Sequence, residues 1–351
     1  MYRFFFLLVL LFIACQEQSK PTTANKGKVF KKMEGITMGV VRYKLTFEDT
    51  ENQIKQVTID SLLLALNMGN SHYEEKSTLS QFNQSVEGII VDNSGYGQHF
   101  IRNVKAATSF FEKTAGYFDP TVAPLMQYYG FREKEIEGLE AIDTARIIAI
   151  MPSVGFDQIS IQKVGDQFEI KKNNPATQLD FSAIAKGYAI DQVGQFLERK
   201  GVQNYLVDIG GEALCKGKNA KGAWWNIAIQ DPKAPRGYYH NQSLMLQNEA
   251  MATSANYESF RIIDGKKMGH TMNPKTGFPE SNDLLSATVV APDCITADSY
   301  ATAFMAMGME KAFNLAQKLP DVEAYLLYVD ENGETAIKYT EGLAENVKQL
   351  Y

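Results

Sequence analysis

The 351-residue chain has three cysteines, too few to hold a chain of this length together by disulfide bonds. It also lacks an excess of positive charge, since 35 Lys and Arg residues face 41 Asp and Glu residues and give a formal net charge of −6. A net-acidic chain without a long basic run is not expected to have nucleic acid as its main partner. Hydrophobic residues at 45% and charged residues at 22% exclude a disordered or collagen-like chain and indicate a globular protein with a sizeable core.

Long hydrophobic runs are rare as well. One apolar run covers residues 4–14, and its 11 residues fall well short of the roughly 20 that a helix needs to cross a bilayer. Arg3 precedes the run, and Cys15 with a polar stretch follows it. This arrangement is typical of a secretory signal peptide and resembles a bacterial lipobox, with Phe12 in place of the usual Leu. The alternative, a buried N-terminal helix with a core cysteine, is less favoured because such a helix would carry a polar face.

We therefore expect a signal peptide at residues 1–14, a lipidated Cys15 with a polar tether over residues 15–30, and one folded domain over residues 31–351. The lipid would anchor an exported bacterial lipoprotein to a membrane, on an extracytoplasmic and preferably periplasmic face. Cys215 and Cys294 would then be the remaining thiols, and the sequence leaves open whether they pair.

Hydrophobic periodicity predicts the elements of the domain. Residues 41–47 alternate apolar and polar side chains, as a half-buried strand does. Helical spacing of apolar residues predicts helices near 59–66, 100–111, 184–200, 296–307 and 310–319. Further strands are predicted at 202–208, 225–230, 243–247, 259–263, 285–291 and 324–329, with a hairpin turn at 264–265. Strands outnumber the crossover helices of a strict βαβ alternation, which favours an α+β fold with antiparallel sheets and packed helices over a doubly wound fold.

The familiar catalytic and nucleotide-binding signatures are absent: the sequence has no P-loop, no strand-linked GxGxxG, no HExxH and no Cys/His zinc spacing. Short polar segments with glycine remain. Residues 179–188 (LDFSAIAKGY) lead from a strand end into a helix start, with Ser182 as a candidate N-cap. Free N–H groups at such a start bind anions, phosphate especially. A plain N-cap with a surface Lys186 explains the same residues.

Two other segments carry candidate chemistry. Residues 270–277 (HTMNPKTG) indicate a rigid loop, and His270 at its entrance is a candidate base, with a purely structural histidine as the alternative. In residues 297–302 (ADSYAT), Asp298 and Thr302 are four apart and share a helix face, which offers two oxygen ligands to a Mg²⁺ ion that also holds phosphate. A helix-start aspartate with an unrelated threonine is the alternative. TMG at 37–39 and FDPTVAPL at 118–125 indicate turns.

The order of these segments is more specific than any one of them. TMG is followed by FDPTVAPL, LDFSAIAKGYAID with a downstream DIGGE, ATSANY, HTMNPKTG and ADSYAT. In this order, from about residue 37 to about residue 308, the chain resembles the ApbE family of FAD:protein FMN transferases. The resemblance implies an ApbE-like, T-fold-like architecture with FAD in a central cleft. It also implies a reaction in which Mg²⁺ helps to split the pyrophosphate of FAD, FMN moves onto a Ser or Thr hydroxyl of an acceptor flavoprotein, and AMP leaves.

The same resemblance implies roles for individual residues. His270 would take the proton from the acceptor hydroxyl. The metal ligands would be the backbone carbonyl of Ala185 and the side chains of Asp298 and Thr302. The FAD contacts would come from Met38, Tyr73, Tyr117, Phe118, Asp119, Ser182, Tyr188 and Met272. Ser182 and Ala183 depart from the family pattern, because glycines often occur at these positions. Glu212 in DIGGE has no role that the resemblance implies.

Two other functions stay open on the sequence. In a Mg²⁺-dependent FAD pyrophosphatase, water would replace the protein hydroxyl as the nucleophile. Tyr73 favours transfer, because related hydrolases can have an asparagine at the aromatic that covers the cofactor. In a non-catalytic flavin-binding lipoprotein, the chain would only store or deliver FAD. Asp298, Thr302 and His270 argue against that function, since simple binding needs no metal ligands together with a base.

Overall fold

The computed structural model describes residues 29–49, 51, 53–132, 141–230, 239–256, 260–280 and 283–349. The expected signal peptide at residues 1–14, Cys15 and nearly all of the tether at 15–30 lie outside these residues, so they stay predictions. Within the described ranges, no helix combines the length and the apolar character needed to cross a membrane.

One eight-stranded sheet organises the chain. In spatial order its strands are β1 (Phe30–Thr37), β2 (Val41–Glu48), β6 (Tyr205–Ile209), β7 (Glu212–Lys216), β10 (Ala250–Ala255), β13 (Leu284–Ala291), β14 (Glu323–Val329) and β15 (Thr335–Tyr339). Every neighbouring pair is antiparallel. The predicted α+β fold with antiparallel sheets is therefore confirmed, since a doubly wound sheet would have parallel neighbours.

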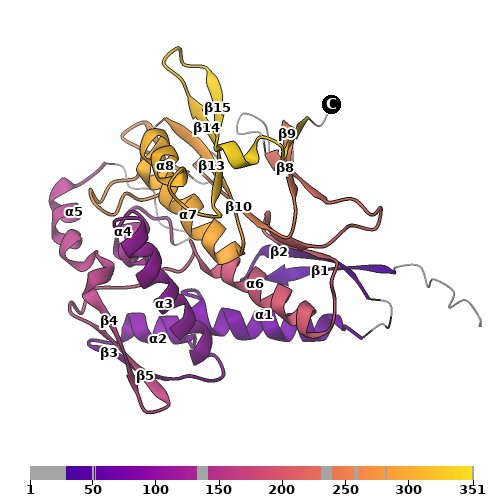
Figure 1. Cartoon of the computed structure of the whole chain (residues 1–351). Coiled ribbons are helices and arrows are strands. Elements are labelled where there is room, and N and C mark those ends of the chain that lie inside the picture. The colour runs from indigo at the N-terminus through magenta and orange to yellow at the C-terminus, as the bar shows by residue number, and fades with distance from the viewer. Residues whose placement is uncertain are drawn as a thin grey trace, which may run out of the picture.

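Helices cover one face of this sheet (Figure 1). The helices α1 (Gln56–Asn70) and α6 (Ala185–Arg199) pack on the half that holds β1, β2, β6 and β7, and α7 (Cys294–Met307) packs on β10 and β13. In β2, Tyr43, Leu45 and Phe47 are buried, while Arg42 and Lys44 are exposed. This alternation is the one predicted for a half-buried strand at residues 41–47.

A small second sheet covers the opposite face. It contains β16 (Val347–Gln349), β9 (Tyr239–Leu246) and β8 (Trp225–Gln230), in that spatial order. Trp225 and Leu246 belong to the same apolar cluster as Met251 of β10 and Leu327 of β14. Ala252, the next residue of β10, belongs to the helix-side cluster instead, because successive side chains of a strand point to opposite faces.

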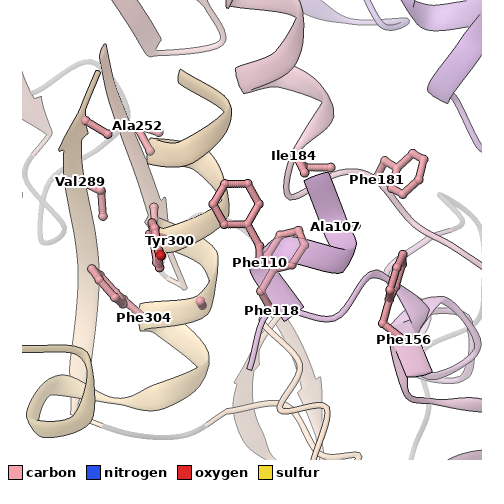
Figure 2. Packing of buried hydrophobic residues seen from close by; sticks show 14 of the residues in the cluster. Ala107, Phe110, Phe118, Phe156, Phe181, Ile184, Ala252, Val289, Tyr300 and Phe304 are labelled. Carbon is pink, nitrogen blue, oxygen red and sulfur yellow. The ribbon is translucent and has the colours of Figure 1, made fainter. Parts of the chain in front are cut away.

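The largest apolar cluster lies on the helix side and holds the chain around the site. It includes side chains from α2 (Thr78–Gln84), α3 (Gly97–Lys113), α7, α8 (Met309–Ala316) and the three-stranded sheet of β3 (Gly88–Asp92), β5 (Gln167–Lys172) and β4 (Ile159–Val164). Figure 2 shows Phe110 of α3 between Phe118 and Tyr300 of α7. The Phe110 ring centroid lies 5.8 Å from that of Phe118 and 5.5 Å from that of Tyr300. These contacts pack the segment around Phe118 near α7, and Leu179, Phe181 and Ile184 belong to the same cluster.

The remaining elements are short. They are α4 (Ala123–Tyr128), α5 (Thr144–Ile150) and the hairpin of β11 (Phe260–Ile263) and β12 (Lys266–Gly269). The turn of this hairpin is at Asp264 and Gly265, which have φ values of 52° and 70°. Both values belong to the left-handed region that two-residue hairpin turns require, so the predicted turn is confirmed.

Two local predictions were wrong. The strand predicted at 202–208 begins only at Tyr205, because Gly201 and Val202 close the end of α6 by donating to the carbonyls of Glu198 and Leu197 at 2.8 and 3.1 Å. The segment 118–125, predicted as a turn, contains a 3₁₀ helix at Pro120–Val122 that continues into α4. Asp119 caps this helix, since its Oδ1 accepts from the amide of Thr121 at 2.8 Å.

Candidate active site

A cavity of about 860 Å³ opens where β7 and β10 separate. Its wall is formed by the β6–β7 turn, the end of β10, the start of α6, one side of α7 and the loops around residues 117–122 and 270–274. The segments that line the cavity come from distant parts of the sequence, from Val40 to Thr302. The volume lies at the upper end of the roughly 300–1,000 Å³ that is usual for small-molecule sites, as a dinucleotide would require.

Most of the residues assigned to the site by resemblance line this cavity. They are Tyr117, Phe118, Asp119, Ser182, His270, Met272, Asp298 and Thr302. Asp298 and Thr302 line it together because both lie on one side of α7, as their spacing predicts. The fold thus brings the candidate base His270 and two of the three candidate metal ligands, Asp298 and Thr302, to one site, and their roles stay predictions.

Four assigned residues do not line the cavity. Met38 is at the β1–β2 turn with a φ of 47°, and Val40 beside it does line the cavity. Tyr73 is 70% exposed, and its ring lies 3.9 Å from that of His72, centroid to centroid. Ala185 is partly buried against the main apolar cluster.

Tyr188 is the fourth of these residues, and it points into the protein. Its hydroxyl lies 2.9 Å from Nδ1 of His99, a buried residue of α3. Burial raises the pKa of Tyr188 to about 12. The sequence does not reveal this orientation, because His99, which contacts the Tyr188 hydroxyl, lies 89 residues earlier in the chain.

A charge cluster of the half-buried Lys186 with the buried Glu212 and Asp298 occupies the wall at the start of α6. The ammonium of Lys186 lies 2.6 Å from Oε1 of Glu212 and 3.6 Å from Oδ1 of Asp298. The other Asp298 oxygen, Oδ2, accepts from the amide of Gly187 at 3.0 Å. Burial by itself lowers the pKa of Lys186, but the carboxylates of Asp298 and Glu212 outweigh it and raise that pKa. Lys186 is therefore a cation at neutral pH.

Oxygen atoms dominate the part of the wall that would hold a metal. The Asp298 carboxylate is almost fully buried, and Thr302 Oγ1 lies 3.2 Å from Oγ of Ser254 in β10. Carboxylate and hydroxyl oxygens fit a hard cation such as Mg²⁺, which keeps water or substrate phosphate in its other positions. Among the described residues, no three His, Cys, Asp or Glu side chains form a metal-binding group, so a cation here would need such additional ligands.

Ser182 does not cap α6, which corrects the N-cap prediction. The helix begins after Ile184, which makes no side-chain cap bond. The amide and the hydroxyl of Ser182 instead donate to Oδ1 of Asp180 at 2.8 and 2.6 Å. The reason is that Asp180 is buried and acidic, so it attracts the nearest donors before the helix starts.

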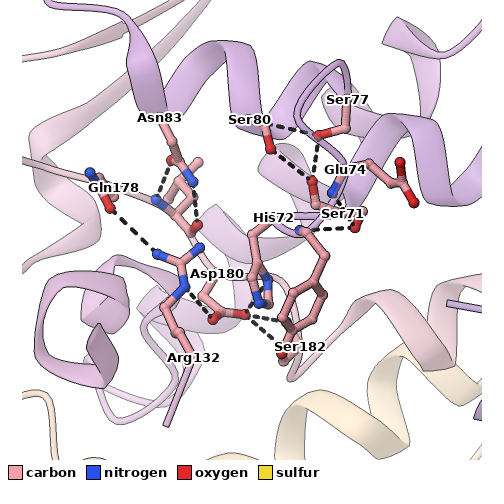
Figure 3. Close-up of polar contacts among 12 residues, drawn as sticks. Ser71, His72, Glu74, Ser77, Ser80, Asn83, Arg132, Gln178, Asp180 and Ser182 are labelled. Carbon is pink, nitrogen blue, oxygen red and sulfur yellow. Dashed lines mark hydrogen bonds and ion pairs between the residues drawn. The ribbon is translucent and has the colours of Figure 1, made fainter. Parts of the chain in front are cut away.

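Asp180 is the centre of a polar network at the cavity edge (Figure 3). Its carboxylate lies 3.5 Å from Nδ1 of His72 and 3.5 Å from Nε of Arg132. Burial alone would raise the pKa of Asp180, but His72, Arg132 and the Ser182 donors lower it. Because the His72 ring also contacts the Tyr73 ring, at an interplanar angle of 42°, the network connects the cavity wall to that exposed aromatic ring.

The opposite end of the cavity contains Asp119 and Tyr117. Burial raises the pKa of Asp119 to about 6, although the Thr121 hydroxyl and amide bonds lower it. Two lysines flank the Tyr117 ring, with Lys275 Nζ 4.4 Å and Lys311 Nζ 5.4 Å from its centroid. Lys311 also donates to the Tyr117 hydroxyl at 2.9 Å. This end combines an aromatic surface with a carboxyl acceptor and positive charge.

The sequence interpretation missed Lys186, Glu212, Asp180 and His72. The sequence is compatible with a surface position for Lys186 and indicates no role for Glu212. One signal was present for Glu212 and Asp180: each is an acidic residue at the edge of a strongly apolar stretch. Such residues are rarely buried unless they have a partner. Their partners come from other elements, so the sequence alone does not identify them.

Comparisons with known proteins find relatives over most of the chain. The ApbE family model matches residues 38–326. A FAD:protein FMN transferase of Haemophilus influenzae is 31% identical over 331 residues, covering 93% of this chain and 92% of that protein. The solved structure of the flavin transferase ApbE from Vibrio cholerae is similar with a TM-score of 0.79 at 29% identity, covering 91% of this chain and 99% of that one. The apo structure of the Pseudomonas stutzeri flavinyl transferase ApbE is similar with a TM-score of 0.77 at 28% identity, covering 91% and 97%. A match of this extent shows that the chain belongs to the ApbE family.

Proposed function

We propose that the chain is an FAD:protein FMN transferase. It moves the FMN part of FAD onto a Ser or Thr hydroxyl of an acceptor flavoprotein, depends on Mg²⁺ and releases AMP. The observation that carries the proposal is the convergence of His270, Asp298 and Thr302 on one dinucleotide-sized cavity. The names of the relatives support flavin transfer as the reaction.

The protein groups divide the work of phosphoryl transfer between positioning and charge stabilisation. His270 accepts the proton of the acceptor hydroxyl, since an aliphatic alcohol is a weak nucleophile at neutral pH. Asp298 and Thr302 hold the cation, with the Gly187 amide fixing the orientation of the Asp298 carboxylate. When bound, Mg²⁺ supplies charge neutralisation across the pyrophosphate.

The rest of the cavity binds and orients the substrate. Tyr117 and Asp119 offer an aromatic surface and an acceptor to the adenosine end of FAD. Lys186 adds a positive charge beside the same wall as Asp298. The apolar cluster around Tyr117 and Phe118 holds this part of the cavity in place, so its side chains need not rearrange during the reaction.

The test is an assay of transfer. The full chain, purified in detergent, is incubated with FAD, Mg²⁺ and a candidate acceptor, and the acceptor mass is measured. We expect FMN on a Ser or Thr of the acceptor, with AMP formed in equal amount. FMN and AMP appearing at the same rate without any acceptor would indicate a pyrophosphatase instead. FAD that binds and is never cleaved would contradict both enzymatic functions.

We further propose that the chain is an exported lipoprotein anchored through Cys15. The support is the apolar run at residues 4–14 followed directly by Cys15 and polar residues. In a bacterial host, Cys15→Ser is expected to release the protein from the membrane fraction, because a lipid anchor needs the thiol. Unchanged membrane association of the Cys15→Ser protein would count against lipidation.

A further inference from the structure

Glu212 has one buried carboxylate oxygen that receives no hydrogen bond from the part of the chain that the structure describes. The residue begins β7, directly after the Gly210–Gly211 turn, and it lines the cavity. Its side chain is 6% exposed. Oε1 pairs with Lys186 at 2.6 Å, whereas Oε2 is buried without a hydrogen-bond partner among the described residues. A buried carboxylate oxygen without a donor is costly, so it calls for a ligand.

The surroundings of Glu212 identify the kind of ligand. Glu212 and Asp298 line the same cavity, and the ammonium of Lys186 lies within 4 Å of an oxygen of each carboxyl group, at 2.6 and 3.6 Å. The fold thus supplies one ammonium group for two buried carboxyl groups. Two carboxylates and the nearby Thr302 hydroxyl offer only oxygen donors, which is the set that a hard divalent cation prefers.

We propose that Glu212 supplies a further oxygen to a divalent-cation site shared with Asp298 and Thr302. Lys186 holds the two carboxylates together when the cation is absent and competes with it for them. This inference rests on the proposed function, because it extends the cation site assigned there. It also gives a role to Glu212 in the DIGGE segment, for which the family resemblance implies none.

The test measures Mn²⁺ binding to the full chain in detergent without FAD, by the electron paramagnetic resonance signal of free Mn²⁺. Glu212→Gln keeps the size of the side chain but removes its charge, and we expect at least about 10-fold weaker binding. Lys186→Met is expected to bind Mn²⁺ several-fold more tightly, because the competing ammonium is gone.

A matched control comes from a second Lys–Glu pair. Glu198 lies 2.6 Å from Lys216, the same separation as in the Glu212 pair, but it is 39% exposed and does not line the cavity. Glu198→Gln should therefore leave Mn²⁺ binding unchanged. Thermal unfolding without metal shows whether each variant is folded.

The outcomes separate this inference from the proposed function. Weaker binding in Glu212→Gln and tighter binding in Lys186→Met support the inference. If Asp298→Asn loses Mn²⁺ while Glu212→Gln binds it as the unchanged chain does, the cation site stands and the inference is overturned. If neither variant loses Mn²⁺, the cation site itself is misplaced. If Glu212→Gln does not fold, Lys186→Met provides the test. Weaker Mn²⁺ binding by Lys186→Met would then overturn the inference, because it would mean that the lysine supports the cation site and does not compete with the cation.

Discussion

Lys186 illustrates how neighbours set the role of a single residue in this site. Its position at the start of a helix is equally suited to a solvent-exposed lysine. In the fold, the Glu212 and Asp298 carboxylates raise its pKa although burial opposes this, so it remains charged inside the wall of the cavity. The same holds for Asp180, whose acidity depends on Arg132 and His72 from other segments.

His270 provides the first prediction at the residue scale. His270→Ala and His270→Gln should both lower the rate of FMN transfer by about 10²–10⁴, because neither side chain can accept the proton of the acceptor hydroxyl. FAD affinity, measured by flavin fluorescence, should change little, because the proton is moved only during the reaction. Gln can still donate and accept hydrogen bonds, so a full transfer rate in His270→Gln would mean that the histidine only positions neighbouring groups.

At the scale of elements, the close approach of α6 and α7 holds the site together. Gly187 lies in α6, and a Cβ atom at that position would collide with the carbonyl oxygen of Cys294 and lie 2.7 Å from its carbonyl carbon. Those atoms belong to the backbone at the start of α7 and have little freedom to move. The helix that carries Asp298 can therefore pack here only because residue 187 has no side chain.

Gly187→Ala should destabilise the fold by about 1–3 kcal/mol or more, since the added methyl group separates two packed helices. Gly194→Ala in the same helix is the matched control. There the added Cβ meets the movable ends of the Leu214 and Tyr205 side chains, at 2.7 and 3.0 Å. Urea unfolding of both variants measures the difference. Equal losses of stability would contradict the close approach at Gly187.

Asp191 provides a second contact between the same two helices and a pH-dependent prediction. From α6, it accepts the amides of Cys294 and Ile295 at 2.7 and 2.9 Å. Burial raises its pKa to about 7, although both amides lower it. The folded state therefore holds the Asp191 proton more tightly than the unfolded state, whose carboxyl has a pKa near the ordinary value of about 3.9. Between these two pKa values, its contribution to stability falls as pH rises.

Asp191→Asn removes this titration and keeps one side-chain oxygen as an acceptor for one of the two amides, so the loss of the other bond lowers stability by an amount that does not depend on pH. The stability of the unchanged chain relative to Asp191→Asn should fall as the pH rises from about 4 to about 7. The measurement is urea unfolding of both proteins at several pH values, and their difference isolates Asp191 from other acids such as Asp119. Parallel stability curves over this range would show that Asp191 does not titrate there.

Helices and strands with regularly spaced apolar residues could be predicted from the sequence. Strands that form mainly because neighbouring strands hydrogen-bond to them could not. The strand at Trp225–Gln230 agrees with the prediction in full, because its apolar residues are regularly spaced. The strand β10 was missed. Its sequence AMATSA has little β-branched or aromatic character, and it forms a strand because β7 and β13 pair with it.

At the scale of the whole molecule, the two described cysteines lie in separate parts of the core. Cys215 of β7 belongs to the cluster beneath the small sheet, and Cys294 of α7 belongs to the cluster beneath α1 and α6. Both are free thiols. Burial raises the pKa of Cys215 to about 11, and burial together with nearby carboxylates raises that of Cys294. Neither thiol is therefore reactive in the folded protein.

We expect an alkylating reagent at neutral pH to leave both Cys215 and Cys294 unmodified in the folded protein, because the reagent reacts with exposed thiolates. After unfolding without a reductant, both should react, as mass spectrometry of the digested protein would show. If the unfolded protein reacted only after reduction, the two residues would be joined by a disulfide and the separation of their clusters would be wrong.

The sequence by itself determined the class of the fold, the alternation in β2, the main amphipathic helices and the shared face of Asp298 and Thr302. All of these depend on residues a few positions apart, whose spacing follows from the geometry of one helix or strand. Only the tertiary structure decided that Tyr188 binds His99, that Ser182 donates to Asp180, and that Glu212 and Lys186 join Asp298. Gly187 and Asp298 are 111 residues apart, and such contacts depend on how complete elements pack together. Local periodicity contains no information about that packing, so the sequence could suggest single residues of the proposed cation site, and only the fold brings them together.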